Sequence, residues 1–262
     1  MSVMPNWQTV DRLIAATTQA GGKIPASVAD VVKVRDAVKA WDAPDPTDLA
    51  GIISRGEMTA ENAHQVMADA LIQPNRTPAD ITSTSLHQLA RRAFSLVTAD
   101  ADKLVRTLQP AHHAAAEKMA KAAEVVDAGT SAEQALQHPE GPAAWQALAE
   151  ARRVLDAVDV VVDLLVGDFE VLGQREPWMH RMNLRHSLMY CATADNYPAA
   201  LRVLTLANGS GGPRGGRWHH APGSLALQLP SAAAALLDEI RQAHLEREAA
   251  DYARTHGVVK TG

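Results

Sequence analysis

Three carboxylates recur at helical spacing in the most apolar part of the chain. Asp156, Asp159 and Asp163 stand three and four residues apart, so a helix places them on one side across two turns. Carboxylates in this arrangement can hold Mg²⁺ together with a substrate phosphate. The same pattern is typical of the solvated face of an amphipathic helix, where Arg152 can neutralise Asp156 from four residues away. We expect the solvated face and keep the metal site as the alternative.

Histidines are the second group of side chains that could hold a metal ion. The chain has 11, and the densest are His112 with His113, His219 with His220, and the pair His180 and His186. Adjacent residues on a helix point about 100° apart, and residues six apart do not share a helical face. The sequence also lacks HExxH and the Glu-x-x-His pair of di-iron bundles. We expect partly exposed histidines at the edges of a bundle, with no metal site and no cofactor.

Nucleophilic chemistry has little support among the motifs. Cys191 is the single cysteine, so the sequence offers no intramolecular disulfide and no CxxC pair for a thiolate zinc site. No GxSxG elbow marks a serine hydrolase, and no catalytic residue is assigned. Because a catalytic triad can be scattered through a sequence, a helical metal-dependent enzyme with an Asp or His site remains an alternative.

Two segments carry basic side chains that could contact a partner. Residues 208–217 hold five glycines with Arg214 and Arg217, and they lack the GxxxxGKS/T ending of a phosphate-binding loop. Their composition is typical of RGG segments that bind single-stranded nucleic acid, but a flexible tether is the stronger interpretation. Residues 177–186 predict a basic amphipathic helix with Arg181 and Arg185. That helix is suited either to a partner surface or to a core position with a basic outer face, and both interpretations stay open.

Composition narrows the class of protein. Of 262 residues, 47% are hydrophobic and 4% aromatic, which is typical of a globular chain with an aliphatic core. The net charge of −5 gives no general attraction to phosphate backbones or anionic membranes, so neither is an expected partner. The first residues lack the pattern of a signal peptide, and the most apolar window, residues 158–166, is too short to span a bilayer. We therefore expect a cytoplasmic protein, or one incorporated in a particle made there.

The elements that must position these residues are helices almost throughout. Glycines, prolines and capping residues predict helices at 7–20, 25–41, 47–54, 59–72, 77–108, 111–127, 142–173, 177–191, 197–207 and 231–256. Pro110 is expected to kink or restart the longest of them. A helix over 77–108 would be about 47 Å long, close to the diameter of a compact chain of this size. We expect an all-α, elongated helical bundle with long helices.

One predicted helix carries a clear packing pattern. Between residues 142 and 173, apolar side chains alternate at spacings of three and four, as in a heptad seam. The seam consists of Leu148, Ala151, Leu155, Val158, Val162, Leu165, Phe169 and Leu172, and Val154 and Val161 widen it. A seam of this width suits a helix that packs against more than one neighbour in a core or an interface.

The C-terminal part predicts an extended arm. Leu225, Leu227 and Leu229 alternate with other residues between two prolines, which allows at most one short strand. We expect a bundle at 1–208 with a sub-boundary near 73–77, a Gly-rich tether at 209–217, and the arm with a C-terminal helix at 218–262. The tether spans roughly 17 Å as a random coil. Because the arm has no partner strand, we expect a swap onto a neighbouring subunit rather than a return to its own bundle.

These patterns favour a non-enzymatic structural or assembly subunit that packs against copies of itself or within a larger complex. Long helices, an apolar seam and an arm are the parts by which subunits reach one another, as in components of virion or capsid assembly by analogy. The alternatives are the metal-dependent enzyme above and a nucleic-acid-binding accessory protein. The latter would act through Arg214, Arg217 and the helix at 177–186.

Overall fold

The structure is helical wherever it has regular secondary structure. A computed structural model describes residues 4–41, 49–71, 78–173, 182–206, 210, 212–221 and 225–256. Within these ranges no residue is in a strand, so the expected all-α class is confirmed. In the same ranges, no helix is long and apolar enough to cross a bilayer.

The helices keep the predicted order, with two short helices added at 132–137 and 212–215, and with the helix predicted at 111–127 beginning at Ala101. They are α1 (Trp7–Gln19), α2 (Ala26–Lys39), α3 (Leu49–Ser54), α4 (Ala63–Leu71), α5 (Pro78–Ala99), α6 (Ala101–Ala123), α7 (Ala132–Gln137), α8 (Gly141–Gly167), α9 (Met182–Leu188), α10 (Tyr197–Thr205), α11 (Gly212–Gly215) and α12 (Pro230–His256). Two 3₁₀ turns, η1 (Ala194–Asn196) and η2 (Gly216–His220), precede α10 and follow α11.

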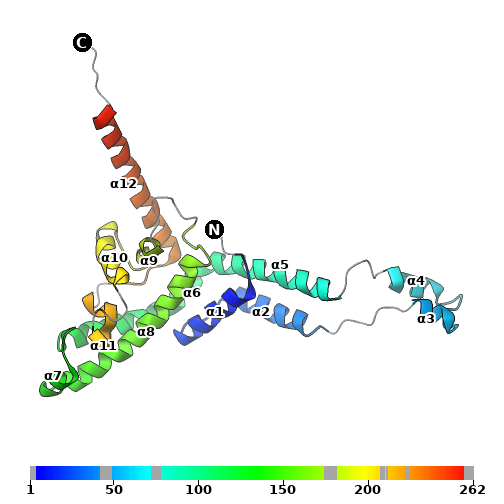
Figure 1. Ribbon diagram of the computed structural model, residues 1–262, viewed down its shortest axis with the longest axis horizontal. Helices are drawn as coiled ribbons and strands as arrows, with labels where there is room; N and C mark the ends of the chain where they lie inside the picture. The colour runs from blue at the N-terminus through cyan, green and yellow to red at the C-terminus, as the bar shows by residue number, and fades with distance from the viewer. Residues whose placement is uncertain are drawn as a thin grey trace, which may run out of the picture.

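The fold is organised around α8. This helix packs along α6 and against α1, α7, α9 and α11 (Figure 1). α2 and α5 lie side by side and extend away from that group, α3 and α4 pair with each other, and α12 projects in another direction from α9 and α6. The chain is therefore elongated and branched, and its bundle is confined to the helices around α8.

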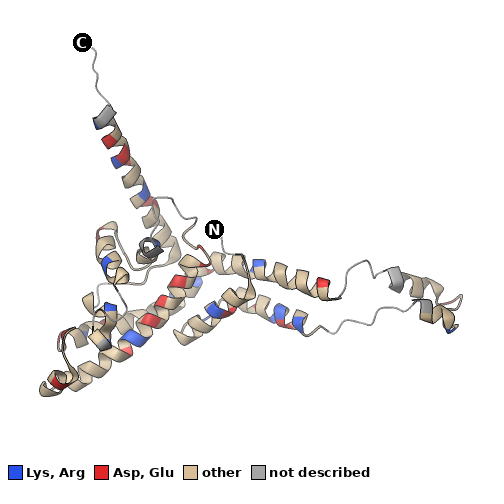
Figure 2. Ribbon diagram, viewed as in Figure 1, with Lys and Arg blue, Asp and Glu red and all other residues tan. Residues whose placement is uncertain are grey.

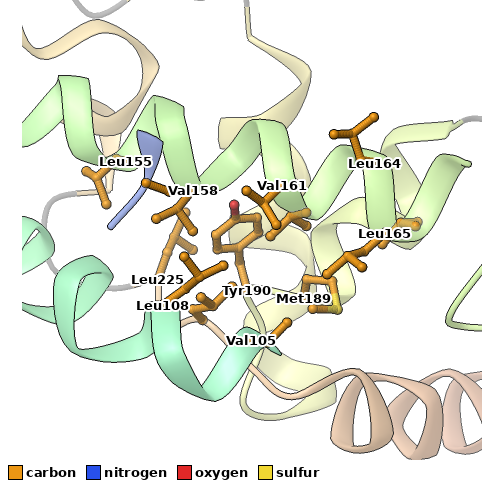
Figure 3. Packing of buried hydrophobic residues seen from close by; sticks show 14 of the residues in the cluster. Val105, Leu108, Leu155, Val158, Val161, Leu164, Leu165, Met189, Tyr190 and Leu225 are labelled. Carbon is orange, nitrogen blue, oxygen red and sulfur yellow. The ribbon is translucent and has the colours of Figure 1, made fainter. Parts of the chain in front are cut away.

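The core is aliphatic and lies mainly between α8 and α6. The seam residues from Leu148 to Leu172 are all buried, although Phe169 and Leu172 follow the end of α8. Figure 3 shows Leu155, Val158 and Leu165 turned toward side chains of α6 and toward Met189 and Tyr190. A helix that meets several neighbours buries a broad stripe, which explains why Val161 and Leu164 are buried too.

The long helix predicted over 77–108 breaks at Asp100 and not at Pro110. Asp100 separates α5 from α6, and its carboxylate accepts a hydrogen bond from Ser27 of α2 and pairs with Lys103 at 2.6 Å. Pro110 lies inside α6, where it removes one backbone hydrogen bond. Leu108 and His112 are buried on either side of it, so packing against the core maintains the helix through the proline.

Residues 212–217, expected to belong to a flexible tether, are helical and packed against α8. They form α11 and the start of η2. Gly212 has φ +85°, and a Cβ there would come within 2.3 Å of the Ala128 carbonyl oxygen. A Cβ at Gly215 would lie 2.6 Å from Nδ1 of His219. These glycines permit close approach of the backbone to its neighbours, which composition alone does not distinguish from flexibility.

The arm returns to its own chain, contrary to the expected swap. Leu225 and Leu227 are buried in the core, and Leu229 is half-buried. The Gln109 side chain donates to the Leu227 carbonyl at 2.9 Å, and the Gln228 N–H donates to the Met189 carbonyl at 2.7 Å. The arm thus stays extended without a partner strand, because α6 and the segment after α9 form hydrogen bonds with part of its backbone.

Truncating the seam tests this core. Leu155→Ala and Leu165→Ala each leave a cavity between α8 and α6, so each should lower the free energy of unfolding by about 2–5 kcal/mol. Chemical denaturation measures the change. Leu136→Ala, the same truncation at an exposed site on α7, should change stability by less than ~0.5 kcal/mol. Unchanged stability in both seam variants would contradict their burial.

Candidate functional site

A buried carboxylate, Asp159, forms the centre of the polar cluster inside this fold. Asp159 is only 8% exposed, although it belongs to the strip that the sequence predicted to be solvated. Asp156 is half-buried, and Asp163 is the most exposed of the three. The expected solvated face is therefore wrong for Asp159, because α9 and η2 cover that side of α8.

Three side chains from two distant segments bind the carboxylate oxygens of Asp159. Nε2 of His186, in α9, lies 2.7 Å from Oδ1 of Asp159, and the Tyr190 hydroxyl donates to the same oxygen at 2.8 Å. The Arg217 guanidinium, in η2, pairs with the other oxygen. Nδ1 of His186 also lies 3.5 Å from Asp163, so this imidazole bridges two carboxylates of α8.

Asp156, one turn earlier on α8, holds the same η2 segment. Its carboxylate accepts a hydrogen bond from the indole N–H of Trp218 at 2.7 Å and pairs with Arg152 at 3.2 Å. Trp218 is buried, and its ring meets the ring of Tyr190 edge-on at 5.7 Å between centroids. Asp156 and Asp159 therefore fix η2 to α8 through two neighbouring charged contacts.

The charges within the cluster balance at neutral pH. Burial alone would raise the pKa of Asp159, but the hydrogen bond and charge of His186 and the charge of Arg217 lower it below its usual range. Burial would lower the pKa of His186, but its contacts with Asp159 and Asp163 raise it to about 9. Burial raises the pKa of Tyr190 well above its usual range. Two cations thus face two carboxylates, with Tyr190 neutral.

A second buried histidine lies behind Tyr190. The His112 ring is 5.7 Å from the Tyr190 ring, and its Nε2 is buried without a hydrogen-bond partner. Burial lowers the pKa of His112 to about 4, against the opposing effect of Asp159. The imidazole is therefore neutral at physiological pH and packs as a core side chain, not at the bundle edge as expected.

A cavity of about 410 Å³ borders the cluster, and its polar lining includes Arg12, Asp159, Asp163, His186 and Arg217. These side chains are already paired with one another, apart from Arg12, which lies 3.8 Å from Asp168. Among the described residues no group of three or more His, Cys, Asp or Glu side chains is arranged to hold a metal ion. The arrangement is suited to joining helices more than to binding an ion.

Arg185, Arg214 and Arg217, the predicted basic contact residues that the structure describes, do not gather on one surface. Arg185 is buried and donates to the Gly173 carbonyl, and Arg217 is in the Asp159 cluster. Arg214 is exposed, with its guanidinium 5.3 Å from the centre of the Trp145 ring. Arg181 lies outside the described residues. The structure thus corrects the prediction for Arg185 and Arg217, whose guanidinium groups bind partners within the fold.

Among the described residues, the remaining groups that the sequence singled out lie outside the Asp159 cluster. Cys191 is buried, its thiol donates to the Ser187 carbonyl, and burial raises its pKa to about 12. His219 is buried, whereas His113 and His220 are exposed. His180 lies outside the described residues. A nucleophilic thiolate is therefore not available at Cys191 near neutral pH.

Tyr190 and Trp218 are the members of the cluster that the sequence reasoning missed. One usable signal was present: Asp159 stands inside the most apolar window of the chain, where a carboxylate needs a partner. His186 and Tyr190 stand four residues apart, as two donors to one carboxylate would on a helical turn.

Removing the central charge should destabilise the fold. Asp159→Asn removes the counter-charge of Arg217 and one of the two carboxylates that face His186, and both cations are largely covered, so we expect the free energy of unfolding to fall by about 3–5 kcal/mol. Urea denaturation measures the loss. Asp163→Asn removes a more exposed carboxylate of the same helix and should cost less than ~1 kcal/mol. Equal effects of the two variants would refute a central role for Asp159.

The two buried histidines should make stability depend on pH in opposite directions. Between pH 6.5 and about 9 folded His186 keeps a proton that the unfolded chain releases, so stability falls as pH rises. Between pH 6.5 and about 4 the unfolded chain binds a proton that folded His112 excludes, so stability falls as pH falls. Unfolding curves across this range should lose the alkaline decline in His186→Gln and the acid decline in His112→Gln. His113→Gln, at an exposed site, should keep both, and a wild-type profile in either core variant would count against the assignment.

Comparison with known proteins assigns no family to this chain. No family model matches it, and no curated protein or solved structure shows significant similarity to it. Any proposal about function therefore depends on the geometry described above.

Proposed function

We propose that the chain is a non-enzymatic assembly subunit that associates with copies of itself through α12. The observation that carries this proposal is the distal half of α12, which extends beyond the rest of the fold (Figure 1). Ala233, Leu236 and Leu237 anchor the first half in the core. From residue 245 onward, every described side chain of the helix is exposed.

The distal half carries an apolar stripe suited to a partner helix. Leu245, Ala249 and Tyr252 stand four and three residues apart, which places them on one face. Leu245 is 51% exposed and Tyr252 68% exposed. A helical segment of this length is marginal in water without tertiary contacts, so packing of this face against another chain would stabilise it.

The polar cluster supports a structural role in preference to a catalytic one. General acids and bases work best with pKa values near the working pH. The pKa of His186 is raised to about 9 and that of His112 lowered to about 4, so neither imidazole changes charge near pH 7. The carboxylates and cations of the cluster are committed to one another. The cluster therefore serves to hold α9 and η2 on α8.

A metal-dependent enzyme is the second candidate, because Asp159, Asp163 and His186 line one cavity, although the described residues are not arranged there to hold an ion. Elemental analysis of the purified chain separates the two candidates. The assembly proposal expects no stoichiometric divalent metal, and a bound equivalent that is lost in Asp159→Asn would favour the enzyme. A nucleic-acid-binding role has weaker support, since Arg217 is partly buried in its pair with Asp159 and Arg214 alone of the two arginines is exposed.

Truncation tests the role of α12. A chain that ends at His244 keeps the anchored half of the helix and loses the exposed half, so it should fold and remain a monomer. The full chain, 28.0 kDa as a monomer, should show a scattering mass that rises with concentration into the high micromolar range. Light scattering after size-exclusion chromatography measures both. A full chain that stays a monomer throughout would overturn the proposal.

A further inference from the structure

A groove of about 700 Å³ runs along α8 between α1 and α11. Its lining includes Ala149, Arg153, Ala157 and Val160 of α8, Ala16 of α1 and Arg214 of α11. We propose that this groove receives the distal half of α12 from a second copy of the chain. This proposal rests on the proposed function and identifies the surface to which α12 binds.

The apolar residues of the groove and the stripe on α12 extend over similar lengths. Ala149 and Ala157 are two turns apart on α8, about 12 Å at 1.5 Å per residue, and their small side chains let another helix approach closely. Leu245 and Tyr252 are also two turns apart, about 10 Å. Val160 is 51% exposed at the end of the groove, which leaves an apolar surface for a large side chain to cover.

The charges on the two surfaces are complementary. Arg153 and Arg214 are exposed at the groove, and Arg152 lies beside them in its pair with Asp156. The distal half of α12 has a small acidic excess, with Glu246, Glu248 and Asp251 against Arg247 and Arg254. Figure 2 shows these charges along the projecting part of α12. Opposite charges on the docking helix and at the groove favour both the rate and the orientation of docking.

The donor helix must come from another copy. α12 is anchored on α9 and α6 and points away from α8 and α11 (Figure 1). Its exposed half therefore cannot fold back into the groove of its own chain. A helix of one copy in the groove of the next is a head-to-tail contact, which closes into a ring or continues as a filament.

Mixing two defective variants tests this contact. Val160→Glu blocks the groove and leaves α12 intact, and the chain ending at His244 has an open groove and no donor helix. Each alone should be a monomer by light scattering. An equimolar mixture should form a complex of two chains and no larger species, because the donor of one partner fills the groove of the other. If copies associated instead by pairing α12 with α12, the two variants would form no complex with each other, because one of them lacks the distal half of that helix.

Controls separate failure of the groove from failure of the proposed function. Val34→Glu, at a valine on α2 that is 49% exposed, should associate like the wild type. Arg153→Glu, at an exposed site, provides a second groove variant with the fold preserved, and we expect it to weaken association ~10-fold or more. If the wild type associates through α12 but Val160→Glu and Arg153→Glu associate equally well, the groove is not the acceptor. A monomeric mixture of the two defective variants would also overturn it.

Discussion

The fold depends on how the carboxylate of Asp159 is satisfied inside an aliphatic core. A buried carboxylate is costly unless cations and hydrogen-bond donors replace water around it. Around Asp159 this water is replaced by His186, Tyr190 and Arg217, which stand 27, 31 and 58 residues away in the chain. Because each donor is fixed to one oxygen of one side chain, α9 and η2 can adopt only a narrow range of positions on α8. Apolar packing alone would not specify these positions, since aliphatic side chains fit together in many ways.

The local features of the fold could be predicted from the sequence. Helix termini follow from proline, glycine and capping residues, and the burial of Leu148 and Val158 follows from their spacing. The break at Asp100 could not be predicted, because it depends on Ser27 of α2 and on core packing that supports Pro110. The close approach of Gly212 to the carbonyl of Ala128, which a Cβ would obstruct, depends in the same way on tertiary packing.

The candidate site was less predictable than the helices. Asp156 and Asp159 could be identified as neighbours on α8, but their environment depends on which segments cover that face. Arg217 reaches Asp159 because α11 packs against α8, and no local sequence pattern indicates a contact between residues 58 positions apart. The contacts of Asp156 and Asp159 hold η2 on α8, and η2 continues from α11, which contributes Arg214 to the groove. A rigid acceptor surface lowers the entropy cost of docking a partner helix.

Amide hydrogen exchange over residues 212–220 tests the central claim most directly. If Asp156 and Asp159 bind this segment to α8, the amides of η2 should exchange slowly, with protection close to that of α8 and lost selectively in Asp159→Asn. Exchange of these amides at unfolded-chain rates in the wild type, while α6 and α8 stay protected, would show a flexible tether and contradict the account.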